Sequence, residues 1–293
     1  MMSKKVSIIM PCYNQGKYVR EAIESVLHQT YKNIEIVCVN DASSDNSNDI
    51  IQNILSELNP DNFIYINHTE NKGVVATRNE AIEIATGEYI LPLDADDTIE
   101  PTYVEKAVNI LDENPDVGIV YCWVNNFWKD SNSQISKWED FDISKELFLN
   151  SIVNTSMYRK SDFLLVGGYK SYMNKGWEDW DLWLSIIEKG FKAHLIKEVL
   201  FNYRRKFFNS RSNSAVKSIA HLYRELLRHH TELYINNDCF IDRVFNQNYQ
   251  ILLEKDIKDK EQKRILRRYR KMCFEVVFIL IMFYLIMFLY LML

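Results

Sequence analysis

The chain has 293 residues, of which 47% are hydrophobic and 26% charged, with only 8 glycines and 5 prolines. This length allows one large domain or two small ones and a sizeable buried core. The low glycine and proline content excludes collagen-like and proline-rich disordered proteins. The five cysteines form no CxxC pair, which favours a reducing compartment over a disulfide framework or a zinc site.

The formal net charge of −5 is unevenly distributed along the chain. Residues 263–271 (KRILRRYRK) hold six basic residues and no acid, so the rest of the chain carries 29 basic against 40 acidic residues. An acidic body with one basic segment is atypical of nucleic-acid-binding proteins. We therefore expect no nucleic-acid partner.

An apolar segment follows the basic one at the end of the sequence. Residues 276–293 are uncharged and largely hydrophobic, and a helix of that length would reach about 27 Å against about 30 Å for a hydrocarbon core. With basic residues on one side only, the pattern predicts a single-pass C-terminal membrane anchor over residues 273–293; the alternative is a buried core helix. The N-terminus lacks a signal-peptide pattern, so the predicted location is the cytoplasmic face of the cell membrane.

Strand and helix patterns alternate through the first half of the chain. Short apolar runs predict strands at residues 6–10, 34–40, 63–67, 89–93 and 117–123. Apolar residues at helical spacing predict helices over about 19–27, 50–58 and 74–85, and from Pro101 onward. This alternation predicts an α/β fold with a mostly parallel, Rossmann-like sheet and helices on both faces. Ligands of such sheets bind beyond the carboxyl ends of the strands, which directs attention to residues 11–14, 40–43 and 94–97.

The second half is harder to interpret. Residues 128–145 are polar and irregular, and one clear amphipathic helix is predicted at 178–189. From residue 216 to about 271 the pattern predicts two long polar helices, broken near residues 236–237, the second leading into the predicted anchor.

The segment YILPLDADD delivers three carboxylates to the end of an apolar strand. In an extended chain Asp94 and Asp96 point to the same side, since side chains alternate with period two. Paired carboxylates suit a hard divalent cation, and Mg²⁺ typically uses one or two of them together with phosphate oxygens. Alternatively, the acids cap the helix that starts at Pro101.

Three other residues each allow a functional and a structural interpretation. Asp41 in VNDAS accepts hydrogen bonds either from a nucleobase or ribose, or within an Asx turn. Tyr13 either stacks on a base or is a half-buried loop residue. Arg78 in NKGVVATRN either forks onto phosphate oxygens or lies on a helix surface. GxGxxG and GxxxxGK[ST] are both absent, which disfavours dinucleotide redox enzymes and P-loop hydrolases.

Two acids open the helix predicted at GWEDWDLW. Glu178 and Asp179 there are compatible with a simple role, because acids in a first turn interact favourably with the helix dipole. The three tryptophans of this segment suggest a second role. A carboxylate enclosed by them would be partly desolvated, which raises its pKa and makes it a better general base.

Taken in order, VSIIMPCYN, VNDAS, NKGVVATRN, YILPLDADD and GWEDWDLW resemble the family 2 glycosyltransferases, of the type that builds bacterial cell-surface glycans. These are inverting, nucleotide-sugar-dependent enzymes with the GT-A fold, and the resemblance covers about residues 6–212. It implies a GT-A catalytic domain at 1–215, with a nucleotide-sugar half at 1–125 and an acceptor half at 126–215. A helical extension at 216–272, with a basic juxtamembrane segment, and the anchor at 273–293 would follow.

The resemblance also implies residue roles. Pro11 and Tyr13 would line the nucleobase pocket, Asp41 would bind the base, expected to be uracil, and Arg78 would lie near the nucleotide. Asp94 would contact the ribose side and Asp96 would hold Mg²⁺ or Mn²⁺ on the diphosphate. Asp179 matches the catalytic base, with Glu178 beside it. The segment YRRKFFNSRS resembles the part that closes over the diphosphate, where Arg205 and Ser210 align best. There Phe207 replaces a histidine of many relatives, and Arg204 is an alternative to Arg205.

The implied reaction moves a sugar from a nucleotide-sugar, expected to be a UDP-sugar, to a hydroxyl of a saccharide or lipid-linked acceptor in surface polysaccharide synthesis. Two alternatives stay open. One is a polyprenyl-phosphate glycosyltransferase, and the other is a non-catalytic sugar-nucleotide-binding membrane protein. The complete carboxylate set at Asp94, Asp96 and Asp179 argues against the second alternative.

Overall fold

The structure is a computed structural model that describes residues 3–58, 62–128, 133–205, 218–242 and 267–278. The chain divides into two compact units, Met1–Phe240 and Ile241–Leu293. The sheet and the candidate site belong entirely to the first unit.

Four strands of the first half form a parallel sheet. They are β1 (Val6–Cys12), β2 (Ile34–Asn40), β3 (Phe63–Asn67) and β4 (Tyr89–Pro92), in the spatial order β3-β2-β1-β4. Nearly every residue of β1 and β2 is buried, as expected of strands covered on both faces. The predicted strands in this part of the chain are confirmed.

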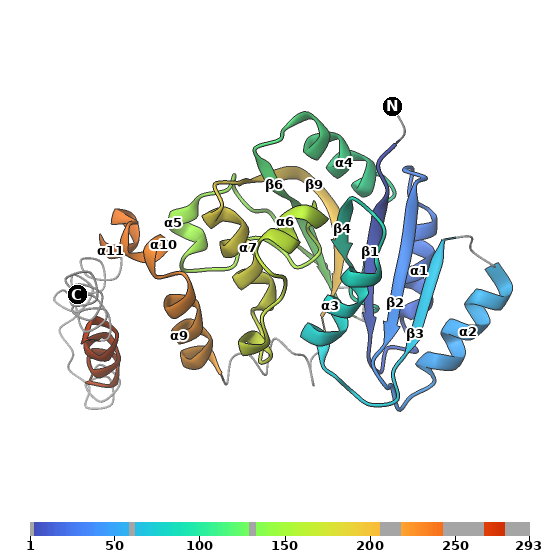
Figure 1. Cartoon of the computed structure of the whole chain (residues 1–293), viewed down its shortest axis with the longest axis horizontal. Coiled ribbons are helices and arrows are strands. Elements are labelled where there is room, and N and C mark those ends of the chain that lie inside the picture. Colours follow the sequence, from blue (N-terminus) through green and yellow to red (C-terminus); the bar gives the residue numbers. More distant parts are fainter. Residues whose placement is uncertain (1–2, 59–61, 129–132, 206–217, 243–266, 279–293) are drawn as a thin grey trace. The chain divides into compact units, whose positions relative to one another are not determined.

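Helices cover both faces of the sheet, as predicted (Figure 1). One face carries α1 (Val19–Leu27), α2 (Ser47–Leu58) and α4 (Tyr103–Glu113). The other face carries α3 (Val74–Ile84), α6 (Lys160–Leu165) and α7 (Glu178–Glu188). Each helix buries its apolar side against the strands, so two hydrophobic layers enclose the sheet.

The second half makes the sheet mixed, which corrects the prediction of a mostly parallel one. The added strands are β5 (Thr98–Ile99), β6 (Val117–Phe127), β7 (Ser133–Ser136), β8 (Met157–Arg159) and β9 (Lys192–Arg204). Strand β8 runs antiparallel between β4 and β6, and β6 is parallel to β9. Among the described strands, four pairings are parallel and four antiparallel. Strands β5, β7 and β8 have only two to four residues, too few to produce a recognisable periodic pattern.

The described part beyond β9 is helical but broken into short pieces. Helices α9 (Ile219–His229), α10 (Thr231–Ile235) and α11 (Asp238–Asp242) follow one another, where two long helices were predicted. The short helix α5 (Ile143–Glu146) lies in the segment that was predicted to be irregular. The interval 243–266 lies outside the described residues.

The predicted membrane anchor and the location derived from it are corrected. Residues 267–278 form a helix of about 18 Å, and its first five residues include four of the basic side chains. Within the described ranges, no helix is long and apolar enough to cross a membrane. Most of the predicted anchor, residues 279–293, lies outside them. The assignment to the cytoplasmic face of a membrane rested on a spanning helix, and this finding overturns it.

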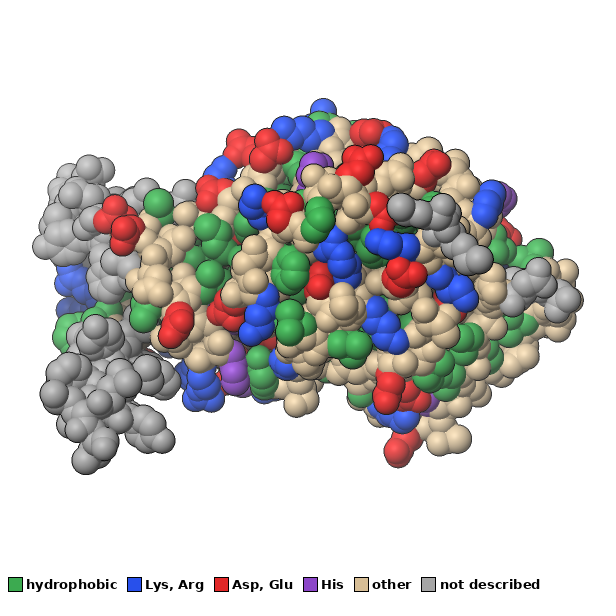
Figure 2. Space-filling model, turned by 45° about the horizontal axis from the view of Figure 1, so that its top comes forward, with side chains coloured by type: hydrophobic (Ala, Val, Ile, Leu, Met, Phe, Trp, Pro, Cys, Tyr) green, Lys and Arg blue, Asp and Glu red, His purple; other side chains and the backbone are tan. Residues whose placement is uncertain are grey.

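Charges of both signs intermingle on the visible face of the molecule (Figure 2). The described residues include exposed ion pairs, such as Lys106 with Glu198 and Lys192 with Asp116. Exposed pairs of this kind contribute about 0–1 kcal/mol each. The stability of the fold therefore comes mainly from the two hydrophobic layers and from buried polar contacts.

The most heavily bonded buried carboxylate of the sheet is Glu35, near the start of β2. Its oxygens accept hydrogen bonds from the Ser7 hydroxyl (2.5 Å), from the Thr86 amide and hydroxyl (2.5 and 2.6 Å) and from the Gly87 amide (3.1 Å). Burial alone would raise the pKa of Glu35, but these donors and Lys5 outweigh it and lower the pKa. This network joins β1, β2 and the segment that enters β4, at the end of the sheet opposite the carboxyl ends of its parallel strands.

We predict that Glu35→Gln destabilises the protein by about 1–3 kcal/mol at pH 7, because buried donors lose their acceptor. Since the folded-state pKa is depressed, this contribution is complete above the unfolded value of about 4.3. It is lost as pH falls through the lower folded-state pKa. Urea unfolding at pH 7 and at pH 3 should therefore show a difference that shrinks in acid. The exposed Glu83→Gln is the control, and an equal loss in both variants would contradict the network's role.

Candidate active site

The loops that follow β1 and β2 lie against each other at the carboxyl edge of the parallel strands. The Asp41 amide donates to the Cys12 carbonyl (2.8 Å), and the Asn14 amide donates to the Ser43 hydroxyl (2.9 Å). Tyr13 is 49% exposed on this edge, and Pro11 is half-buried. Adjacent parallel strands deliver their following loops to one crevice, so the structure brings together the residues expected around a nucleobase.

Asp41 is buried and bonds to the chain itself. Its carboxylate accepts from the Lys72 amide (2.8 Å) and the Gly73 amide (2.9 Å), and it lies 2.8 Å from His68 Nδ1. Burial would raise the pKa of Asp41, but these hydrogen bonds and His68 lower it. The carboxylate thus fastens the loop that leads into α3.

The acidic segment after β4 is a turn, not an extended strand end. The Asp97 amide donates to the Asp94 carbonyl (3.0 Å), so the extended strand end from which a shared side for Asp94 and Asp96 was predicted is not present. The Asp94 carboxylate accepts from Arg78 Nη2 (2.5 Å) and from Asn154 Nδ2 (3.1 Å).

Arg204 holds this turn in place. Its Nε donates to the Asp96 carbonyl (2.8 Å), and its Nη2 donates to Glu21 on α1 (2.5 Å). Its guanidinium lies 4.3 Å from the ring centre of Tyr18 and 4.5 Å from that of Phe127. These contacts connect the turn to α1 and to β6.

The neighbouring Arg205 lines a cavity instead. Its Nε donates to Asn126 Oδ1 (2.9 Å), and its guanidinium lies 4.8 Å from the ring centre of Tyr203. Of the two candidate arginines, Arg205 is therefore the one in the cavity, whereas Arg204 supports the acidic turn. Ser210 and Phe207 lie outside the described residues.

Arg78 joins two distant parts of the chain. It projects from α3, is only 1% exposed, and donates from Nη1 to Glu178 (2.7 Å) and from Nη2 to Asp94 (2.5 Å). Burial opposes its charge, but the two carboxylates more than compensate and raise the pKa of Arg78. The alternative of a surface helix arginine is thus wrong.

Asp179 follows Glu178 in the first turn of α7 and has different partners. Its Oδ2 accepts from Asn150 Nδ2 (3.1 Å), and its Oδ1 accepts from the Trp180 amide (2.9 Å). Burial and the neighbouring charge of Glu178 raise the pKa of Asp179 to about 6, against the opposing effect of Arg78. A carboxyl group with such a pKa can exchange a proton near neutral pH.

The backbone is strained next to these residues. Among the described residues other than glycine, three have positive φ: Asn14, Ala42 and Trp177 (54°, 54° and 60°). They directly adjoin Tyr13, Asp41 and Glu178 respectively. Positive φ in residues with a Cβ is costly and is often concentrated at functional sites.

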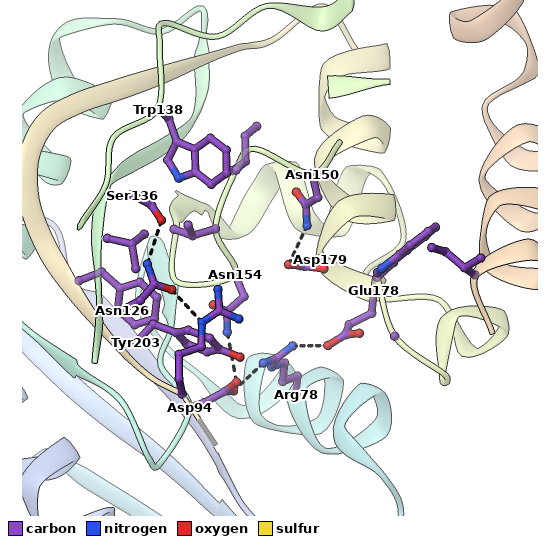
Figure 3. Close-up of a pocket in the computed structure, with 18 residues that line it drawn as sticks. Arg78, Asp94, Asn126, Ser136, Trp138, Asn150, Asn154, Glu178, Asp179 and Tyr203 are labelled. Atoms are coloured by element: carbon purple, nitrogen blue, oxygen red, sulfur yellow. Dashed lines mark hydrogen bonds and ion pairs between the residues drawn. The ribbon is translucent and has the colours of Figure 1, made fainter. Parts of the chain in front are cut away.

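A cavity of about 390 Å³ collects most of these side chains (Figure 3). Five predicted site residues line it: Arg78, Asp94, Glu178, Asp179 and Arg205. Pro11, Tyr13, Asp41 and Asp96 are not among its lining residues. Polar lining residues that the sequence did not predict include Asn126, Ser136, Trp138, Asn150 and Asn154, whereas Tyr203 opens the segment predicted to close over the diphosphate. For two of them the sequence holds a weak cue, a pair of asparagines four residues apart at 150 and 154.

The carboxylates fit a cation that arrives with a substrate. Within the described ranges, no group of three or more His, Cys, Asp or Glu side chains forms a metal cage. However, Asp94 and Asp96 lie at the two ends of a three-residue stretch of the acidic turn, both partly exposed, and offer carboxylate oxygens. Since Mg²⁺ commonly takes only one or two protein carboxylates when phosphates complete its shell, this donor set is compatible with Mg²⁺ or Mn²⁺ on a diphosphate.

Comparison with known proteins gives a consistent result. The family model described as glycosyl transferase family 2 matches residues 7–175. Glycosyltransferase GlyG of Streptococcus pneumoniae is 30% identical over 275 residues, which cover 90% of this chain and 80% of that protein. An uncharacterized glycosyltransferase of Methanocaldococcus jannaschii is 32% identical over 209 residues, covering 68% and 70%. The minor teichoic acid biosynthesis protein GgaB of Bacillus subtilis is 32% identical over 206 residues, covering 68% and 23%.

Solved structures agree in fold. S. aureus TarS 1–349 in complex with UDP-GlcNAc aligns with a TM-score of 0.67 at 20% identity, covering 88% of this chain and 77% of that chain. The mannosyltransferase PcManGT from Pyrobaculum calidifontis, in complex with GDP-Man and Mn²⁺, aligns with a TM-score of 0.62 at 20% identity, covering 78% and 65%. The chain is a glycosyltransferase and belongs to glycosyl transferase family 2.

Proposed function

We propose that this glycosyltransferase uses a nucleotide-sugar, a UDP-sugar in particular, and inverts the anomeric centre during transfer to an acceptor hydroxyl. The observation that carries the proposal is the position of Asp179. It has a raised pKa and shares one cavity with the Arg78–Asp94 ion pair. A proton acceptor and a charged pair thus line the same cavity.

The nucleotide would bind at the edge formed by the loops after β1 and β2. There the exposed Tyr13 ring offers a stacking surface beside Pro11, and Asp41 offers a carboxylate for a base N–H. The Asp41 carboxylate already has three hydrogen-bond partners. Because a carboxylate has about four acceptor sites, it can still accept a hydrogen bond from a base. The similarity in fold to TarS, solved with UDP-GlcNAc, supports a uridine nucleotide.

The diphosphate would lie over the acidic turn, with Arg78 and Arg205 near the sugar. A cation held by Asp96, with Asp94 beside it, would neutralise the negative charge that develops on the leaving diphosphate. PcManGT, solved with Mn²⁺, supports this cofactor. Arg204 would keep the turn in position through the Asp96 carbonyl.

Asp179 would remove the proton from the attacking hydroxyl. Glu178 is engaged by Arg78, whereas Asp179 accepts from the neutral amide of Asn150, so Asp179 is the acid of the pair that is placed to take a proton. Attack on the anomeric carbon from the face opposite the diphosphate breaks the carbon–oxygen bond in one displacement and inverts the configuration.

The need for a base favours a hydroxyl over a phosphate acceptor. A sugar hydroxyl must lose its proton in order to attack, whereas a polyprenyl phosphate is already ionised near neutral pH and gains little from a base. We therefore prefer a saccharide, free or lipid-linked, to the polyprenyl-phosphate alternative. Similarity to a teichoic acid biosynthesis protein supports a role in surface polysaccharide synthesis. The predicted nucleotide-sugar half (1–125) and acceptor half (126–215) would meet at the cavity.

Asp179→Asn should lower kcat by about 10²–10⁴-fold, the usual contribution of a general base. Asparagine keeps the shape of the side chain but cannot take the proton. Release of nucleoside diphosphate from UDP-sugars measures the effect, and the KM for the donor should change little. A variant with near-normal kcat would remove Asp179 from the base role.

The pH dependence of kcat/KM should show an acidic limb near pH 6. Because the base must be ionised, activity should rise with pH through the pKa of Asp179, which burial and Glu178 raise to about 6. The same limb in the residual activity of Asp179→Asn would show that another group is titrating.

Asp96→Ala should weaken activation by Mn²⁺, because one carboxylate ligand is lost. Activity measured against Mn²⁺ concentration in chelator-buffered solution should show a shift of about tenfold or more to higher metal. The exposed Asp49→Ala on α2 is the control. Unchanged metal dependence in Asp96→Ala would exclude this residue as the ligand.

A further inference from the structure

The cavity has two walls of different chemistry. One wall carries the charged Arg78 and Asp94, whereas the lining residues Ser136, Trp138 and Asn150 on the other are uncharged. Figure 3 shows Trp138 and Asn150 on one side of Asp179, with Asp94 and Arg78 on the other. Ser136 and Trp138 come from residues 128–145, the segment that the sequence left uninterpreted.

The geometry of an inverting displacement indicates which wall faces the donor and which faces the acceptor. This step rests on the proposed function, in which the diphosphate leaves on the side of Asp94. In an inverting displacement the attacking group enters opposite the leaving group. The acceptor must therefore approach Asp179 from the side of Trp138 and Asn150.

Two buried polar atoms of this wall have unused hydrogen-bonding capacity. Trp138 Nε1 and Asn150 Oδ1 have no hydrogen-bond partner in the described part of the chain, although Asn150 Nδ2 is bonded to Asp179. An indole N–H only donates and an amide oxygen only accepts. Sugar hydroxyls can satisfy both, and a sugar ring also packs well against an indole. A phosphate oxygen, which only accepts, would face the Asn150 oxygen unfavourably.

The charged residues that line the cavity also favour an uncharged acceptor. Its described charged lining consists of two arginines and three acids, and one of the arginines, Arg78, already pairs with Asp94 and Glu178. No lysine lines it within the described ranges. An ionised phosphate placed next to Asp179 would meet net negative charge, whereas a neutral ring would not.

We propose that Trp138 and Asn150 form an acceptor subsite that takes an uncharged saccharide ring and presents its hydroxyl to Asp179. Trp138 supplies ring contact and an N–H donor. Asn150 bridges the ring and the base, since its amide nitrogen bonds to Asp179 while its oxygen accepts from the sugar.

The test uses the full chain with Mn²⁺ and UDP-GlcNAc, UDP-glucose or UDP-galactose as donors. UDP release is measured in water alone, with a panel of neutral p-nitrophenyl glycosides, and with a short-chain polyprenyl phosphate. We expect at least one neutral glycoside to stimulate release and the polyprenyl phosphate not to. Stimulation by the phosphate, or by none of the glycosides, overturns the proposal.

Substitutions of Trp138 show whether this residue contributes to acceptor binding or to donor binding. Trp138→Ala should raise the acceptor KM about tenfold through loss of ring contact, and Trp138→Phe should raise it by about fivefold through loss of one hydrogen bond. Leu149→Ala, exposed and adjacent to Asn150, is the control and should behave like the wild type. If both Trp138 variants raise the donor KM instead, Trp138 belongs to the donor site and the subsite is wrong. If the wild type releases no UDP from any donor, the proposed function itself fails.

Discussion

The buried ion-pair chain from Asp94 through Arg78 to Glu178 is the interaction on which the candidate site depends. It joins the end of β4 to the start of α7, which are far apart in sequence. A buried charge that loses its partner typically costs about 3–5 kcal/mol, so the buried Glu178 in particular depends on the guanidinium, whereas Asp94 is partly exposed and also accepts from Asn154. Without Arg78, three acids would also crowd one cavity. The same side chain therefore fixes the geometry of the site and limits its negative charge.

The sequence predicted the parallel half of the fold well because that half is regular. Strands β1 to β4 are mostly apolar runs, and the crossover helices α1 and α2 carry clear amphipathic patterns. Most candidate residues of this half lie at or just after the carboxyl end of a strand, where a rule about strand ends finds them. Asp41 and Asp94 were identified in this way. The mutual contact of Arg78 with Asp94 and Glu178 could not be, because periodicity contains no information about which buried charges meet.

The antiparallel strand β8 explains why the sequence missed Asn150 and Asn154. In a parallel sheet, the functional edge is reached by segments that follow strands. Because β8 runs opposite to β4, the segment that precedes it arrives at that same edge. Asn150 and Asn154 lie just before β8 and bond to Asp179 and Asp94. A strand of three residues leaves no readable pattern, so neither its direction nor the importance of the preceding loop could be inferred.

The two adjacent acids of α7 acquire different roles from helix geometry. Successive residues of an α-helix are rotated by about 100°, so two neighbouring side chains in a first turn cannot face the same partner. Glu178 is directed to Arg78, whereas Asp179 is directed to Asn150. The left-handed backbone of Trp177 sets the start of the helix and hence this rotation. A pair that looks redundant in sequence is thus divided into an acid that is held in an ion pair and an acid whose pKa is raised by burial and by its neighbour. Proteins commonly assign proton-transfer roles at neutral pH by placing two carboxylates in environments that move their pKa values apart.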